Sequence, residues 1–291
     1  MDLVLATCQF PVDRDPAVNR RHIAAQLREA RRRGAHLAHF PECALSGYAG
    51  VEFPSFAGYP WPVLAEQLRA VRELARRLRI WVVLGSSHRL TGRHRPHNCL
   101  YVIDARGRIV DRYDKRFCTG RPGRARGDLR HFTPGDHFVT FRVRGFRCGV
   151  LICHDFRYPE LYRAYRRLGV DLLLHSFHNG HSTAARYRTK GRILGVIVPA
   201  TVQAAAASNH CWISATNTTR RISCWPAFVA RPDGLVAGRL RRHRASVLVT
   251  RLDPVVRYDD ASAAWRDRAL RGVLHSGRLV RDPRSRARRR A

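Results

Sequence analysis

Apolar residues in this chain fall in short runs, and the stretches between the first of these runs have the spacing of amphipathic helices. Runs of about four to eight apolar residues have the length of buried strands. Helices are expected at about 16–33, 65–79 and 199–208, with another beginning near Pro159. Strands are expected at 3–8, 36–40, 80–85, 99–104, 108–113, 138–143, 147–153, 170–175, 211–216, 226–230 and 246–252.

The connections between the predicted strands change along the chain. The first three strands are separated by helices, which is typical of α/β proteins. Two later pairs are joined only by short turns, Ala105-Arg106-Gly107 and Arg144-Gly145-Phe146. Turns of this length predict antiparallel hairpins. The pattern therefore indicates an α/β fold with mixed sheets.

Length and composition are those of a globular protein. The chain has 291 residues, of which 45% are hydrophobic. A domain of this size buries about 75% of the surface that its unfolded chain exposes, and the composition excludes a disordered, collagen-like or coiled-coil protein. Met1 is followed by Asp2 with no signal-peptide pattern, and no run reaches the roughly 18 apolar residues of a membrane span. These features predict a cytoplasmic protein with no membrane partner.

Eight cysteines are scattered along the chain without CxxC spacing. In a chain of this length, that pattern favours reduced intracellular thiols over a disulfide framework. Most of them should be inert core residues. They are Cys8, Cys43, Cys99, Cys118, Cys148, Cys153, Cys211 and Cys224.

The chain is strongly basic, with 54 Lys and Arg against 22 Asp and Glu and a net charge of +32. Only Lys115 and Lys190 are lysines, and the arginines are spread along nearly every segment, as in the product of a GC-rich genome. They are therefore weak evidence for nucleic-acid binding. Residues 261–291 form an Arg-rich tail beyond a domain at 1–260, with ten arginines against two aspartates. We expect a disordered or interface-forming terminus, with a nucleic-acid-binding arm as the alternative.

Three segments place a reactive side chain just past an apolar strand, where side chains of an open α/β sheet converge. A thiol with its free pKa of about 8.5 needs a nearby base or cation to act as a nucleophile. Glu42 could be the base, Lys115 the cation and Cys153 the nucleophile; the alternatives are a capping carboxylate, a solvated lysine and a buried strand cysteine. The segments are Phe40-Pro41-Glu42-Cys43, Tyr113-Asp114-Lys115-Arg116 and residues 151–160.

In their order and setting, these segments resemble the nitrilase superfamily of carbon–nitrogen hydrolases over about residues 1–255. The resemblance implies a four-layer α-β-β-α sandwich, a homodimer or larger homo-oligomer, and no metal or organic cofactor. It also implies that Glu42 is the general base, that Cys153 forms a thioester, and that Lys115 and the His154 backbone N–H stabilise the oxyanion. Further matches are residues 6–10, 132–136 and 231–234, together with Asn209 and Asn217.

Two positions depart from the pattern of the superfamily. Many amide-hydrolysing members carry a second glutamate shortly before the position of Phe132, where this chain has Asp128. Asp128 either replaces that glutamate or is an ordinary loop aspartate. Arg157 matches an arginine that binds the substrate carboxylate in carbamoyl-amino-acid hydrolases, but the arginine that precedes it in those enzymes is Phe156 here. A structural salt bridge from Arg157, for example to Glu160, is the alternative.

Two further motifs have competing interpretations. His175, His178 and His181 could suggest a metal site, but their spacing is not one of the established zinc patterns. The same segment matches one wall of the family's substrate pocket, so Phe177, His178 and Asn179 are expected to contact substrate. The glycine-rich residues 120–127 lack the ending of a phosphate-binding loop, and we interpret them as a basic lid.

The sequence therefore predicts a thiol amidohydrolase that cleaves a small linear amide and releases ammonia or an amine. The pattern from Cys153 to Glu160 is similar to the amidase branch of the superfamily and differs from true nitrilases. The alternatives are an N-carbamoyl amino acid hydrolase, a relative that transfers the acyl group to another acceptor, and a basic nucleic-acid-binding protein on a hydrolase scaffold. The intact Glu42, Lys115 and Cys153 set argues against the last.

Overall fold

The computed structural model describes residues 1–121, 126–180, 183–287 and 289. The chain divides into two compact units, Met1–Asp259 and Asp260–Ala291. The first unit holds two six-stranded sheets and the helices that cover them. Among its described residues, the second unit holds two short helices, α6 (Ala263–Leu270) and α7 (Pro283–Arg286).

The first sheet has the strand order β12-β1-β2-β3-β4-β5. Its central strands β1, β2 and β3 are parallel, so that Thr7, His39 and Val83 lie side by side. The outer strands β12, β4 and β5 are antiparallel to their neighbours. The strands are β1 (Leu3–Gln9), β2 (Leu37–His39), β3 (Trp81–His88), β4 (His97–Ile103), β5 (Ile109–Asp114) and β12 (Ser246–Leu252).

The second sheet has the order β11-β10-β9-β8-β7-β6. Here β7, β8 and β9 are parallel, and Ile152, Ser176 and Thr216 lie side by side near their carboxyl ends. Strand β11 was not predicted from the sequence, whereas both predicted hairpins are present. The strands are β6 (Thr140–Val143), β7 (Phe146–Ile152), β8 (Leu172–Ser176), β9 (Trp212–Thr216), β10 (Phe228–Ala230) and β11 (Val236–Arg239).

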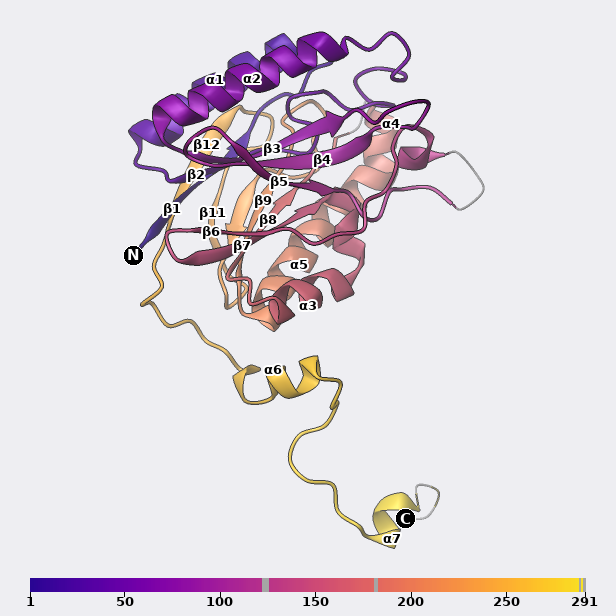
Figure 1. Cartoon of the computed structure of the whole chain (residues 1–291). Coiled ribbons are helices and arrows are strands. Elements are labelled where there is room, and N and C mark those ends of the chain that lie inside the picture. The colour runs from indigo at the N-terminus through magenta and orange to yellow at the C-terminus, as the bar shows by residue number, and fades with distance from the viewer. Residues whose placement is uncertain (122–125, 181–182, 288, 290–291) are drawn as a thin grey trace. The chain divides into compact units, whose positions relative to one another are not determined.

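Helices cover the outer face of each sheet. Figure 1 shows α1 (Pro16–Arg32) and α2 (Trp61–Leu78) over the first sheet, and α3 (Pro159–Arg167) and α5 (Arg192–Asn209) over the second. One buried cluster fills the space between the sheets and beneath α3 and α5, and another lies beneath α1 and α2. Each large aliphatic side chain buried in this way stabilises the fold by about 1.5–3 kcal/mol. This arrangement confirms the predicted four-layer α-β-β-α sandwich.

Local sequence explains where α1 begins and which face it buries. The Asp15 side chain accepts a hydrogen bond from the Ala17 N–H at 2.8 Å, and Pro16 occupies the first turn, where its missing N–H costs nothing. The buried positions Ile23, Leu27 and Ala30 recur at helical spacing. This apolar stripe packs α1 on the first sheet.

Helix α5 differs from the prediction of a helix at 199–208. It begins at Arg192 and continues the helical turns of α4 (Ala184–Arg186) and of residues Tyr187–Gly191, so that Pro199 lies inside the helix. The run Ala184–Asn209 has the length and composition of a membrane span. However, its Val198, Val202 and Ala206 side chains belong to the buried core. Packing of this buried face against the second sheet explains how the helix tolerates an internal proline, which by itself destabilises a helix by about 3 kcal/mol.

A buried polar network joins the two sheets. His39 on β2 lies 2.9 Å from the Ser214 hydroxyl on β9 through Nδ1 and 2.9 Å from the Ser176 hydroxyl on β8 through Nε2. Thr7 extends the network to Ser214 at 2.7 Å. Burial lowers the pKa of His39 to about 3, so the ring is neutral at physiological pH. Because every member needs its partner in a low-dielectric core, the network fixes how the sheets face each other.

Candidate active site

The carboxyl ends of three strands, β2, β5 and β7, bring the predicted reactive residues to one edge of the sandwich. Glu42 follows β2, Lys115 follows β5 and Cys153 follows β7, each directly beyond the carboxyl end of its strand or within three residues of it. Glu42 and Lys115 are fully buried, and Cys153 is partly buried. The strand order therefore places a carboxylate, an ammonium group and a thiol around one point.

Lys115 is the centre of a buried charge cluster. Its Nζ lies 2.8 Å from Glu42 Oε1, 2.7 Å from Asp128 Oδ2 and 3.4 Å from the Tyr48 hydroxyl. Burial alone would lower the pKa of Lys115, but the charges of Asp128 and Glu42 raise it well above its ordinary value. Burial would raise the pKa of Asp128, yet Lys115 and Tyr48 hold it below its ordinary value. The lysine is therefore positive and the aspartate negative at neutral pH.

Glu42 is held with one oxygen engaged and one available. Glu42 Oε1 accepts hydrogen bonds from Lys115 and, at 2.8 Å, from the Asn98 side-chain amide. Within the part of the chain that the structure describes, Glu42 Oε2 has no hydrogen-bond partner. A carboxylate in this state can accept a proton through Oε2 while Oε1 keeps its orientation.

A glycine lets the Glu42 loop approach the sheet. A Cβ atom on Gly85 of β3 would lie 2.0 Å from the Pro41 carbonyl oxygen and 2.7 Å from the Cys43 nitrogen. Any larger residue would therefore displace the loop that carries the carboxylate.

Cys153 sits in a strained turn at the end of β7. Its φ is +39°, a region that non-glycine residues seldom occupy, and it begins a short 3₁₀ helix, Cys153–Arg157. Burial raises the pKa of the Cys153 thiol well above its ordinary value, and Glu42 raises it further while Lys115 lowers it. The resting thiol is thus protonated at neutral pH and needs a base. The Asn179 amide donates a hydrogen bond of 3.4 Å to the sulfur.

Asp155 ties the nucleophile turn to the lysine loop, a role that sequence reasoning missed. Its Oδ2 accepts from the Tyr113 hydroxyl at 2.8 Å and from the Ile152 N–H at 3.0 Å, and its Oδ1 accepts from the Phe117 N–H at 2.9 Å. Burial raises the pKa of Asp155 to about 6. Its position two residues after Cys153 was the available signal, but spacing does not show which way a turn residue points.

Tyr48 and Glu52 were also missed, although both follow Glu42 closely in sequence. Glu52 Oε1 lies 3.1 Å from His178 Nε2 and 2.8 Å from Arg220 Nη1. Burial would lower the pKa of His178, but the Glu52 charge raises it. The His178 ring also meets the Tyr48 ring edge-on, with centroids 5.2 Å apart. The buried ion pair between Glu52 and His178 therefore holds in place the segment that follows β8.

The two described histidines of the predicted metal or pocket motif, His175 and His178, have separate surroundings. His175 contacts the Cys153 carbonyl and the Tyr162 hydroxyl, whereas His178 contacts Glu52. His181 lies outside the described residues, as do residues 122–125 of the predicted lid. His175 and His178 thus belong to two different networks.

His154 and Arg157 take different positions after the nucleophile. His154 is partly buried, and burial lowers its pKa. Arg157 is exposed, with its guanidinium carbon 4.7 Å from the centre of the Phe156 ring. Between the described side chains of Arg157 and Glu160 there is no ion pair, so the structure does not contain the salt bridge offered as the alternative for Arg157.

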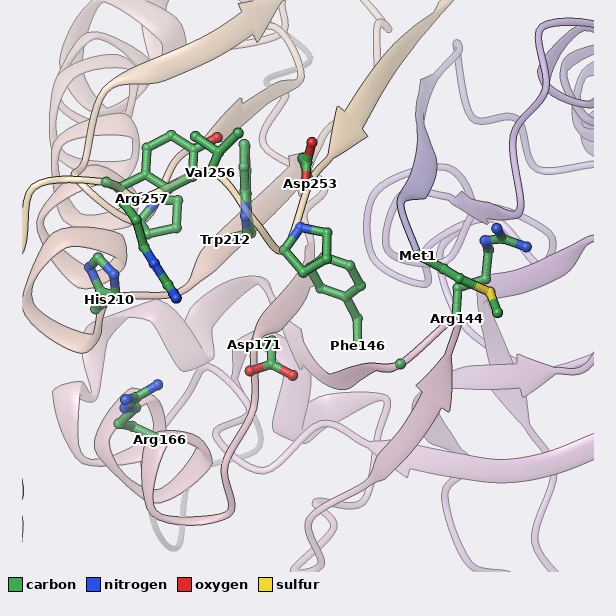
Figure 2. Close-up of a pocket in the computed structure, with 14 residues that line it drawn as sticks. Met1, Arg144, Phe146, Arg166, Asp171, His210, Trp212, Asp253, Val256 and Arg257 are labelled. Atoms are coloured by element: carbon green, nitrogen blue, oxygen red, sulfur yellow. The ribbon is translucent and has the colours of Figure 1, made fainter.

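A separate pocket of about 410 Å³ lies at the other end of the second sheet. Figure 2 shows Phe146, Asp171, Trp212 and Arg257 among its lining residues. Phe146 is the first residue of β7, and Cys153 follows the last. Seven strand residues at about 3.3 Å each separate the two places by roughly 20 Å. This pocket is not part of the catalytic cluster.

An α-β-β-α sandwich with a glutamate, a lysine and a cysteine together at one edge of the sandwich defines a hydrolase of the nitrilase superfamily. A comparison with protein families supports this assignment, because the family model described as carbon-nitrogen hydrolase matches residues 4–259 of the chain. The chain belongs to the carbon–nitrogen hydrolase family.

Known relatives point to amidase-type hydrolases. The chain is 28% identical to omega-amidase NIT2 of Homo sapiens over 59% of its own length and 62% of that protein. It is 30% identical to nitrilase homolog 2 of Dictyostelium discoideum over 50% of its length and 45% of that protein. The matched regions thus span about half to three fifths of these relatives.

The fold is that of solved amidases. An amidase from Nesterenkonia sp. superposes with a TM-score of 0.72 at 22% identity, covering 94% of this chain and 96% of that one. A mutant of the amidase from Nesterenkonia sp. AN1, with the acetamide moiety of fluoroacetamide added covalently at its active-site cysteine, superposes with a TM-score of 0.69 at 21% identity over 87% of this chain and 90% of that one.

Proposed function

We propose that this protein is a thiol amidohydrolase that cleaves the C–N bond of a small linear amide through a thioester on Cys153. The observation that carries the proposal is the Lys115 ammonium group held between Glu42 and Asp128 beside a protonated thiol. This arrangement supplies a base, a fixed positive charge and a nucleophile. The reaction would need no metal or organic cofactor.

The first half of the reaction forms the acyl-enzyme. Glu42 takes the proton from the Cys153 sulfur, which attacks the amide carbonyl carbon and pushes an electron pair onto the carbonyl oxygen. Lys115 and the His154 backbone N–H stabilise this oxyanion. One such donor contributes about 3–4 kcal/mol to catalysis. Glu42 then returns its proton to the amide nitrogen, the C–N bond breaks, and ammonia or an amine leaves.

The second half hydrolyses the thioester. Glu42 removes a proton from a water molecule, whose oxygen attacks the acyl carbon. The tetrahedral intermediate collapses, the C–S bond breaks, and Cys153 regains its proton from Glu42 as the carboxylic acid departs. Asp128 keeps Lys115 charged and oriented through both halves, in the role that a second glutamate has in related amidases.

Three observations bear on the substrate. The named relatives include an omega-amidase and an amidase, which supports amides over nitriles. The His178 backbone and the Asn179 side-chain amide contact the Cys153 sulfur, which supports the proposal that this segment contributes one wall of the substrate pocket. An N-carbamoyl amino acid hydrolase, the second candidate, would use Arg157, which is exposed next to the nucleophile turn.

A release assay tests the reaction class. Purified protein is offered aliphatic amides, omega-amides, N-carbamoyl amino acids and nitriles, and the ammonia released is measured. We expect turnover of small amides and none by Cys153→Ala. Cys148→Ala, which changes the cysteine inside β7 rather than the one that follows it, is the matched control and should remain active. Hydrolysis by Cys153→Ala, or turnover of nitriles alone, would contradict the proposal.

We also propose a cytoplasmic homodimer or larger homo-oligomer that pairs through α5. The solvent side of this helix exposes Ile193, Val196 and Ile197, with 57%, 68% and 40% of their surfaces accessible. Contiguous exposed apolar side chains are typical of a protein interface. Sedimentation of wild type and Val196→Glu tests this proposal: the variant should dissociate, and a monomeric wild type would overturn it.

A further inference from the structure

His175 is a fully buried histidine that the mechanism above does not use. It lies near the end of β8, and its ring stacks on that of Phe177 with centroids 4.1 Å apart. Nδ1 lies 3.1 Å from the hydroxyl of Tyr162 on α3. Nε2 lies 3.3 Å from the backbone carbonyl oxygen of Cys153. Tyr162 on α3 and His175 on β8 therefore form a hydrogen-bonded pair that contacts the backbone of Cys153.

The two partners fix the tautomer of His175. A carbonyl oxygen can only accept a hydrogen bond, so Nε2 carries the proton and donates a hydrogen bond to the Cys153 carbonyl oxygen. Nδ1 is then the bare nitrogen, and the Tyr162 hydroxyl donates to it. Burial holds the pKa of His175 well below its ordinary value, which keeps the ring neutral at physiological pH.

The carbonyl that His175 holds belongs to the same peptide plane as the His154 N–H. In a trans peptide, the C=O and the following N–H point in opposite directions. A hydrogen bond that fixes the oxygen therefore also fixes the direction of the N–H. This restraint matters because Cys153 has φ of +39°, a conformation with little intrinsic preference for a non-glycine residue.

We propose that His175, oriented by Tyr162, is a positioning residue that aims the His154 N–H at the developing oxyanion. The inference rests on the proposed function, because this N–H is used only if the reaction passes through a tetrahedral oxyanion. The aimed donor interacts more strongly with the transition state than with the bound substrate. Loss of the restraint should therefore lower kcat and leave KM nearly unchanged.

The test compares three variants of the Tyr162–His175 pair with one matched control. His175→Phe removes both ring nitrogens, Tyr162→Phe removes only the hydroxyl, and His175→Gln restores an N–H donor. His88→Phe is the control, because His88 makes the same kind of pair with the Tyr101 hydroxyl, at 2.8 Å, in a groove beside α2. Two rates are measured: hydrolysis of the best amide of the panel, and alkylation of Cys153 by iodoacetamide, which forms no oxyanion.

We expect His175→Phe to lower kcat about 30-fold, less than the 10²–10³-fold cost of deleting an oxyanion donor outright. Tyr162→Phe should lower kcat less than His175→Phe does, His175→Gln should recover part of the loss, and His88→Phe should match wild type. Alkylation of Cys153, located by mass spectrometry, should keep its wild-type rate in every variant.

Two results overturn the inference alone: a His175→Phe variant with the kcat of an active wild type, and equal losses of hydrolysis and alkylation. The second result would show that the ring only keeps the site folded. A wild type that hydrolyses no amide of the panel overturns the proposed function, and the inference falls with it.

Discussion

The Tyr48 hydroxyl donates a hydrogen bond of 2.6 Å to one oxygen of Asp128, and the other oxygen of that carboxylate lies 2.7 Å from Lys115 Nζ. Thr119 completes the set, since its N–H donates to Asp128 Oδ2 at 3.0 Å and its hydroxyl accepts from the Asp128 N–H at 2.9 Å. The loop thus carries a short side chain far enough to reach the lysine. This geometry explains how an aspartate at position 128 can contact the Lys115 ammonium group.

Asp128→Asn should lower kcat by about a hundredfold, which is the usual loss when one preorganised electrostatic group is removed. The amide keeps the shape of the carboxylate but not the charge that holds Lys115 ionised and in place. Tyr48→Phe should have a smaller effect in the same direction, because Asp128 then loses one hydrogen bond but not its charge. Steady-state kinetics on the best amide measure both effects. Wild-type kcat in Asp128→Asn would show that Glu42 alone orients the lysine.

Glu52→Gln should destabilise the fold by about 3 kcal/mol, the lower range for removing one partner of a buried ion pair. The pKa of His178 is raised in the folded protein, so its contribution to stability is complete below its unfolded value of about 6.5 and disappears as pH rises through the folded value. The loss should therefore be larger at pH 6 than at pH 9.

Urea unfolding at the two pH values measures this difference, with Glu66→Gln as the control because Glu66 is exposed on α2. An equal loss at both pH values would exclude a charged His178 as the source of the stability.

Residues 260–291 should be dispensable for hydrolysis, because Glu42, Lys115 and Cys153 all lie in the unit Met1–Asp259. A chain ending at Asp259 should keep the kcat of the full chain. Any salt-sensitive retention of the full chain on DNA should weaken on truncation, since the tail carries ten of the arginines. Loss of hydrolysis on truncation would show that the tail completes the site. Unchanged retention would locate any nucleic-acid contact in the first unit.

The sequence was sufficient to predict the strands because most are short apolar runs with turn residues between them. It was insufficient for α5, where an internal proline concealed a helix that packing against the second sheet sustains. Strand β11 was missed because its burial alternates only weakly and it pairs only at the edge. Local pattern reports local preference, whereas tertiary packing determines the extent of these elements.

The residues of the candidate site were likewise predicted only in part. Glu42, Lys115 and Cys153 were found because each follows a strand in a characteristic segment. Asp128 was named as a candidate, but its role was left open, because it meets Tyr48 only when loops 80 residues apart fold together. Asn98, Tyr48 and Asp155 were not found, because they act through side-chain direction. Whether a carboxylate faces a lysine or solvent depends on this long-range geometry, which spacing does not encode.

His39 should make the stability of the protein depend on pH in a way that a neutral substitute does not. Its pKa is lowered to about 3 in the folded state from about 6.5 in the unfolded chain, so its contribution is complete above pH 6.5 and is lost as pH falls toward 3. Each pH unit below 6.5 lowers the free energy of unfolding by about 1.4 kcal/mol.

Between pH 7 and pH 5 the free energy of unfolding should therefore fall about 2 kcal/mol more for wild type than for His39→Asn. The asparagine can still form a hydrogen bond with the Ser176 or Ser214 hydroxyl, but it does not titrate. Urea unfolding of both proteins at the two pH values gives the difference directly, and subtracting the variant removes the contributions of all other titrating groups. Parallel curves would mean that the ring accepts a proton inside the folded network, and the sheet-joining role of a neutral His39 would have to be abandoned.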